Sequence, residues 1–125
     1  MSEISYASVH EFDQELKKLG KKYRSLPDDL ELVKKAAIEL LHRQKIDNQS
    51  IFKIPGYCSE TLLICKLKKF ACRALKGRGN KSGIRIIYAF YPLENRVIFM
   101  EIYFKGDKKN EDHERIRNYL KAGGA

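Results

Sequence analysis

The chain has 125 residues, of which 43% are hydrophobic and 33% are charged, and its formal net charge is +9. This length predicts a single domain over residues 1–125, because two halves of about 60 residues would each have a marginal core. The mixed composition excludes a wholly disordered chain, and the apolar runs are far shorter than the ~20 residues of a membrane-spanning helix.

The N-terminal part of the chain is expected to form one strand and two helices. Residues 3–7 alternate as in a short strand. Apolar side chains recur at helical spacing over residues 12–23 and again over residues 30–41, and Pro27 separates the two stretches. This order predicts a helical hairpin. The polar segment over residues 44–60 has no clear period, so we expect a long loop there.

The C-terminal part is expected to form three strands and a helix. Residues 63–74 alternate in the manner of a strand, with one slip that indicates a bulge. Residues 84–91 and 97–104 form two further alternating runs joined by a short turn. A polar helix is expected over residues 111–121, and residues 122–125 are expected to fray.

These elements predict an α+β domain with the order β-α-α-β-β-β-α. The helical hairpin would pack on one face of a small, mainly antiparallel twisted sheet, giving two layers. The first strand would join the edge of the three-strand meander. The second face of the sheet would then be partly open.

The positive charge is concentrated in one third of the chain. Residues 61–93 contain no acidic residue, whereas the remainder has 17 basic and 16 acidic residues. The basic residues of this window are Lys66, Lys68, Lys69, Arg73, Lys76, Arg78, Lys81 and Arg85. A field of one sign attracts polyanions, so we expect these side chains to bind phosphate groups. The alternatives are a basic surface that maintains solubility or one that binds an acidic protein.

Strand alternation predicts that the basic side chains share the open face of the sheet. Lys66 and Arg85 would project from this face, and the bulge would add Lys68 and Arg73. Tyr103 is expected to be exposed on the same face, where an aromatic ring beside cations can stack on an unpaired base.

The side chains that could transfer protons are three histidines and one glutamate. His10 and His42 lie near predicted helix ends, where a surface or capping position accounts for them. His113 follows the last strand within a loop, so it is a candidate for proton transfer, with an ordinary surface role as the alternative. Glu101 is expected to form a cross-strand ion pair with Arg85.

The sequence predicts no metal ion and no cofactor. The glycine-rich segment over residues 77–83 has Asn80 where a P-loop requires glycine, and a strand rather than a helix follows it. The three cysteines recur at intervals of seven residues, which fits no zinc pattern: Cys58, Cys65 and Cys72. The N-terminus has no signal-peptide pattern, so we expect a cytoplasmic protein with reduced thiols.

Three segments of the sequence resemble the RelE/ParE superfamily of bacterial toxin–antitoxin toxins. Residues 63–68 (LICKLK) resemble its basic strand, and residues 80–88 (NKSGIRIIY) resemble its glycine–arginine segment. Residues 101–112 (EIYFKGDKKNED) resemble its final tyrosine–lysine segment. The helical hairpin precedes these segments in the same order, so the resemblance spans nearly the whole chain and implies the fold of that superfamily.

The resemblance implies a metal-independent endoribonuclease that cleaves mRNA in the ribosomal A site and so represses translation. In this chemistry the ribose 2′-OH attacks the adjacent phosphate and leaves a cyclic phosphate. Matching the segments carries the phosphate-contacting lysines onto Lys66 and Lys68 and the transition-state arginine onto Arg85. A lysine with a lowered pKa among other cations could serve as the base.

The C-terminal segment of the resemblance implies further contacts and partners. Lys105 or Lys108 would contact phosphate, and His113 would be the acid. The resemblance also implies a cognate antitoxin, whose acidic segment would cover the basic face. Because the superfamily includes inhibitors of DNA gyrase, such an inhibitor is the alternative, and a non-catalytic nucleic-acid-binding domain is a third hypothesis.

Overall fold

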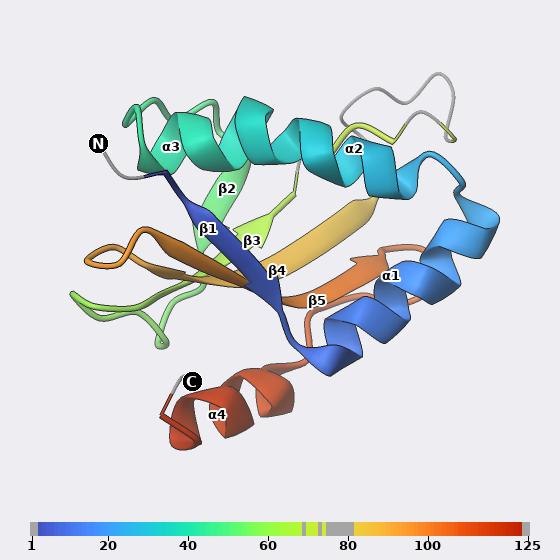
Figure 1. The fold of residues 1–125 in the computed structure, drawn as a ribbon. Helices are drawn as coiled ribbons and strands as arrows, with labels where there is room; N and C mark the ends of the chain where they lie inside the picture. Colours follow the sequence, from blue (N-terminus) through green and yellow to red (C-terminus); the bar gives the residue numbers. More distant parts are fainter. Residues whose placement is uncertain (1–2, 69, 73, 75–81, 124–125) are drawn as a thin grey trace.

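The computed structural model describes residues 3–68, 70–72, 74 and 82–123. Within these residues, the strands are β1 (Ser5–Ser8), β2 (Ile51–Lys53), β3 (Leu63–Leu67), β4 (Ile84–Tyr91) and β5 (Arg96–Phe104). The helices are α1 (His10–Lys22), α2 (Leu26–Val33), α3 (Leu40–His42) and α4 (His113–Lys121), and a π-helical segment, η1 (Lys34–Glu39), joins α2 to α3. The predicted α+β class is confirmed (Figure 1).

The strands of the described residues form one sheet in the order β1-β5-β4-β3-β2. β1 runs parallel to β5, and the other neighbouring strands are antiparallel. The predicted meander and the position of the first strand at its edge are therefore confirmed.

Two features of the sheet differ from the sequence-based prediction. β2 lies within the segment over residues 44–60 that was expected to be a loop. A strand of three residues is too short to show alternation, and it is defined by its pairing with β3. β3 ends at Leu67, whereas the predicted strand reached residue 74. The predicted bulge includes Lys69, which lies outside the described residues, and Phe70 and Cys72 are buried in the core.

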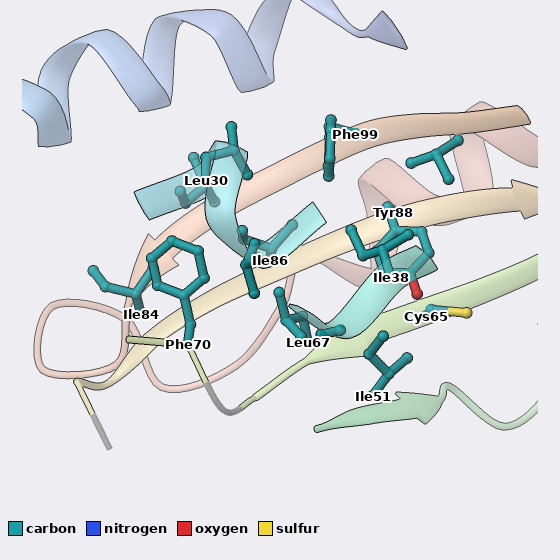
Figure 2. Packing of buried hydrophobic residues seen from close by; sticks show 14 of the residues in the cluster. Leu30, Ile38, Ile51, Cys65, Leu67, Phe70, Ile84, Ile86, Tyr88 and Phe99 are labelled. Atoms are coloured by element: carbon teal, nitrogen blue, oxygen red, sulfur yellow. The ribbon is translucent and has the colours of Figure 1, made fainter. Parts of the chain in front are cut away.

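The helical hairpin covers one face of the sheet and closes a largely apolar core. Leu30 and Ile38 project from the helices onto Leu67 and Ile86 of the sheet (Figure 2). These side chains are 5% exposed or less. Burying each of them contributes roughly 1.5–3 kcal/mol to the stability of the fold.

His42 belongs to this core and not to the surface, which corrects the expected role at a helix end. It is buried, its ring stacks on Phe90, and its Nε2 lies 2.8 Å from the Tyr88 hydroxyl. Burial, followed by the charges of Lys45 and Lys53, lowers the pKa of His42 to about 4.

Among the described residues, α4 covers one end of the second face of the sheet, and the loop between β5 and α4 lies over part of the other end. α4 lies on the side of the sheet opposite α2 and α3 (Figure 1). Its Ile116 packs against Ile64 and Ile98. Arg115 of α4 makes two hydrogen bonds of 3.0 and 2.9 Å to the carboxylate of Glu15 on α1, and this bidentate pair fixes α4 in place.

A β-bulge in β5 decides which side chains reach this second face. Ile87 pairs with Glu101, whereas the next residue of β4 pairs with Phe99, so Met100 is the extra residue. Strict alternation would put Ile98 and Tyr103 on opposite faces. The bulge instead places both in the cluster that α4 covers in part.

Candidate functional site

The strand register arranges the side chains of the second face in rows. The row next to α4 is apolar and consists of Ile54, Ile64, Ala89 and Ile98. The next row consists of Phe52, Lys66, Ile87 and Glu101. The third row consists of Lys68, Arg85 and Tyr103. We refer to the second and third rows as the polar end of this face.

Lys66 forms a partly enclosed ion pair at the polar end. Its Nζ donates a hydrogen bond of 2.7 Å to Oε1 of Glu111, and the two side chains are 15% and 10% exposed. Burial acts to lower the pKa of Lys66, but Glu111 and Tyr103 outweigh it, so this pKa is raised. Lys66 is therefore a cation, and its raised pKa favours a charge-stabilising role over a role as the base.

Glu111 is held in its ionised form. Burial acts to raise the pKa of its carboxyl, but hydrogen bonds from Lys66, the backbone and His113, together with the charge of Lys66, lower that pKa to about 2. The carboxylate thus bonds Lys66 through one oxygen and His113 through the other.

His113 is the centre of a chain of three side chains. Its Nε2 lies 2.8 Å from Oε2 of Glu111, and its Nδ1 lies 3.0 Å from the Tyr57 hydroxyl. An ionised carboxylate only accepts, so Nε2 carries a proton, and in the neutral ring Nδ1 accepts from the Tyr57 hydroxyl. The side chain of Asp112 caps α4 by accepting from the Arg115 backbone N–H, which places His113 in the first turn.

Glu101 anchors the loop that leads to His113. Its buried carboxylate accepts the Asp112 backbone N–H at 2.9 Å and pairs with the ammonium group of Lys108. The expected pair between Glu101 and Arg85 is therefore wrong. Because Lys108 also lies 5.6 Å above the ring of Tyr103, it stabilises this loop on the sheet.

Arg85 and Lys68 are the cations of the third row. Nη1 of Arg85 donates to the backbone carbonyls of Lys68 and Ile84, at 2.9 and 3.4 Å. These bonds orient the guanidinium and occupy one of its nitrogen atoms, so further N–H donors can meet an anion. Lys68 is exposed, with its Nζ 4.9 Å from the centre of the Phe52 ring.

Tyr103 is buried, which corrects the expectation that its ring is exposed. It is 5% exposed, so the ring cannot stack on a base. Its buried hydroxyl lies beside Lys66 but has no hydrogen-bond partner of suitable geometry among the described residues. Burial raises the pKa of this hydroxyl, and Lys66 only partly offsets the effect. The hydroxyl therefore keeps its proton.

The remaining predicted phosphate contacts fall into two groups. Lys105 is exposed after β5, and its backbone N–H donates to the carbonyl of Gly83 at 2.8 Å. Gly83 has a φ of +88°, which favours glycine at this approach to Phe104. The other predicted contacts lie outside the described residues: Lys69, Arg73, Lys76, Arg78 and Lys81.

Residues that are far apart in the sequence lie close together at the polar end, and two of them were not predicted. Lys66 and Arg85 share one face, as predicted, and Glu111 links Lys66 to His113. The sequence did not predict a role for Glu111, because nothing near it in the sequence indicates that it pairs with Lys66, 45 residues away. It also missed Tyr57, which lies in an irregular segment.

The described part of the chain contains no group of three metal-ligating side chains placed to hold an ion. None of its helices is long and apolar enough to cross a membrane.

Comparisons with known proteins identify the fold. No protein-family model and no curated protein matches the sequence. A structure of an archaeal RelE–RelB complex from Pyrococcus horikoshii OT3 matches with a TM-score of 0.51 at 14% identity, over 84% of this chain and 98% of that chain. A metal-bound toxin from Helicobacter pylori matches with a TM-score of 0.50 at 16% identity and the same coverage. The chain therefore has the fold of the RelE-type toxins.

Proposed function

We propose that this protein is the toxin of a type II toxin–antitoxin pair and that it cleaves mRNA on the ribosome. The observation that supports this most is the chain of Glu111, His113 and Tyr57, which lies beside Lys66 on the face that holds Arg85. Cleavage of a phosphodiester needs a proton-transfer group next to cations, and this arrangement supplies both.

The proposed reaction begins when the ribose 2′-OH attacks the adjacent phosphorus. The bond from phosphorus to the 5′ oxygen then breaks, leaving a 2′,3′-cyclic phosphate and a 5′-hydroxyl group. One proton leaves the 2′-OH and one must reach the departing 5′ oxygen. Nδ1 of His113 takes the proton of the 2′-OH, directly or through the Tyr57 hydroxyl, and delivers it by the same route to the departing 5′ oxygen, while Glu111 fixes the tautomer of the ring. Lys66 and Arg85 stabilise the negative charge that develops on the phosphoryl group.

An antitoxin is the protein partner in this proposal. The similar archaeal structure is a RelE–RelB complex, and the present chain has a net charge of +9. An acidic segment of an antitoxin would complement the polar end and cover its cations.

A translation reaction assembled from purified components tests the proposed activity. Addition of the protein should produce cut mRNA, and Arg85→Ala and His113→Gln should each reduce the rate of cutting at least about 100-fold. Two exposed residues provide matched control variants, Arg24→Ala and His10→Gln. Both controls should cut at the rate of the unchanged protein.

Two results would contradict the proposal at different levels. Intact mRNA together with accumulated gyrase–DNA breaks would replace it with the gyrase-inhibitor hypothesis. If both Arg85→Ala and His113→Gln still cut mRNA at the full rate, the protein would be an endonuclease, but its active site would not be the polar end.

A further inference from the structure

Phe52 is a large apolar side chain that the fold leaves unprotected at the polar end. It is 43% exposed, although an aromatic residue of this size is usually buried. It occupies the middle of β2 and pairs with Lys66 in the register, which places it in the second row. The preceding residue, Ile51, points to the opposite, helix-covered face and is buried in the core.

The surroundings of Phe52 are cationic. The ammonium group of Lys68 lies 4.9 Å from the ring centre, which is a cation–π contact. Lys66 lies beside Phe52 across the strand pair, and Arg85 contacts the backbone of Lys68. A flat π surface bordered by cations is the combination that binds single-stranded nucleic acid, because the ring stacks on a base while the cations hold the phosphates.

Tyr103, the other aromatic residue in these rows, cannot supply this surface. Its ring is only 5% exposed, and Lys108 lies above it at 5.6 Å. The candidate residue for base stacking is therefore Phe52 of the edge strand β2 and not Tyr103 of β5.

We propose that Phe52 is a stacking platform for one unpaired base of an RNA strand whose phosphates contact Lys68 and Arg85. The RNA identity of this ligand rests on the proposed function. The platform contacts any base through its π face, so it adds affinity and fixes the strand without selecting a sequence. It would hold the nucleotide next to the phosphate that faces Lys66 and His113.

Binding of RNA oligomers that cannot be cleaved tests this platform separately from the chemistry. The probe is a 2′-O-methyl RNA hexamer, and its partner is the same hexamer with abasic sugars, which has the same phosphate charge. The unchanged protein should bind the base-containing hexamer about 10-fold more tightly than the abasic one. Phe52→Ala should lose this preference, and Phe52→Leu, which keeps apolar bulk without a π surface, should lose most of it.

Lys68→Ala gives the matched control. It should weaken the binding of both hexamers by a similar factor and should reduce the salt dependence, because it removes a phosphate contact and not a stacking surface. The preference for bases should remain in this variant.

A tryptophan reporter gives a direct readout, because the chain contains no tryptophan. The fluorescence of Phe52→Trp should be quenched by the base-containing hexamer and not by the abasic one. Leu93→Trp places the reporter at a site that is 83% exposed in the β4–β5 turn, and its fluorescence should not respond.

The outcomes separate the platform from the endonuclease. Equal binding of both hexamers by the unchanged protein, or full base preference in Phe52→Ala, would overturn the platform even if mRNA is cut as proposed. Loss of the preference in Phe52→Ala would establish the platform even if the translation reaction shows no cutting. A platform that instead docks an acidic protein would give no difference between the hexamers and would also overturn the proposal.

Discussion

The two faces of the sheet are built from the same strands but are held together by different forces. On β3, Cys65 and Leu67 point towards the helical hairpin and are buried, whereas Lys66 between them points to the other face and binds Glu111. Because side chains alternate along a strand, adjacent residues can serve the core and the candidate site separately. The comparison shows how a small chain can keep a stable core directly behind a polar surface.

The two faces should also respond differently to substitution. The helix-covered face depends on apolar burial, which is non-directional and spread over many side chains. The polar end depends on a chain of hydrogen bonds in which Glu111 holds both Lys66 and His113. Loss of one member of such a chain disturbs its neighbours more than the fold.

The largest expected effect is a loss of stability from the helix-covered face. Leu67 is fully buried against the helices, so Leu67→Ala should reduce the free energy of unfolding by about 3 kcal/mol. Urea denaturation followed by circular dichroism measures this change. The folded variant should retain its affinity for RNA, because Leu67 does not reach the polar end.

The next residue along the chain provides the matched control. Lys68 is exposed on the opposite face, and Lys68→Ala should change the free energy of unfolding by less than about 0.5 kcal/mol while weakening RNA binding. If Lys68→Ala were more destabilising than Leu67→Ala, the conclusion that the helix-covered face provides stability and the polar end provides binding would be wrong.

The sequence predicted the elements that depend on local periodicity. The helical hairpin and the β4–β5 meander follow from apolar side chains at helical or strand spacing. The shared face of Lys66 and Arg85 follows from the same alternation, because all of β3 pairs with β4 and Lys66 pairs with Ile87, two residues after Arg85.

Features that depend on contacts between distant residues were not predicted. β2 is defined by its partner strand, and the bulge at Met100 places Ile98 and Tyr103 on one face, although strict alternation would separate them. The burial of His42 depends on Tyr88, which is 46 residues away in the sequence. Likewise, Glu111 becomes part of the site only when the loop folds back onto Lys66.

A medium-sized effect is expected from pH on the helix-covered face. The pKa of His42 is about 4 in the folded protein and about 6.5 when unfolded, so the unfolded chain binds the proton more readily. Its contribution to stability should therefore be lost as the pH falls from about 6.5 towards 4. We expect the free energy of unfolding to drop by about 2 kcal/mol between pH 7.5 and pH 4.5.

Urea denaturation at a series of pH values measures this drop. His42→Gln should be less stable at pH 7.5 but should show a flatter curve in this window. His10→Gln, at an exposed position, should retain the slope of the unchanged protein. An unaltered slope in His42→Gln would show that another group accounts for the acid sensitivity.

The smallest expected effect belongs to the polar end and occurs at lower pH. The pKa of Glu111 is about 2 in the folded protein, below its ordinary value of 4.5, because Lys66 and His113 outweigh the effect of burial. Its contribution is therefore present above about pH 5 and is lost as the pH falls towards 2. Solvent screens this pair, so we expect a contribution of about 1 kcal/mol.

Glu111→Gln should remove this step below pH 5 without changing the step between pH 6.5 and pH 4 that belongs to His42. Glu114→Gln, at an exposed position in the first turn of α4, is the matched carboxylate control and should keep both steps. Because the two windows overlap only near pH 4–5, one titration of stability can assign each step to its face. A single step that disappears in both His42→Gln and Glu111→Gln would show instead that the two faces unfold through one coupled network.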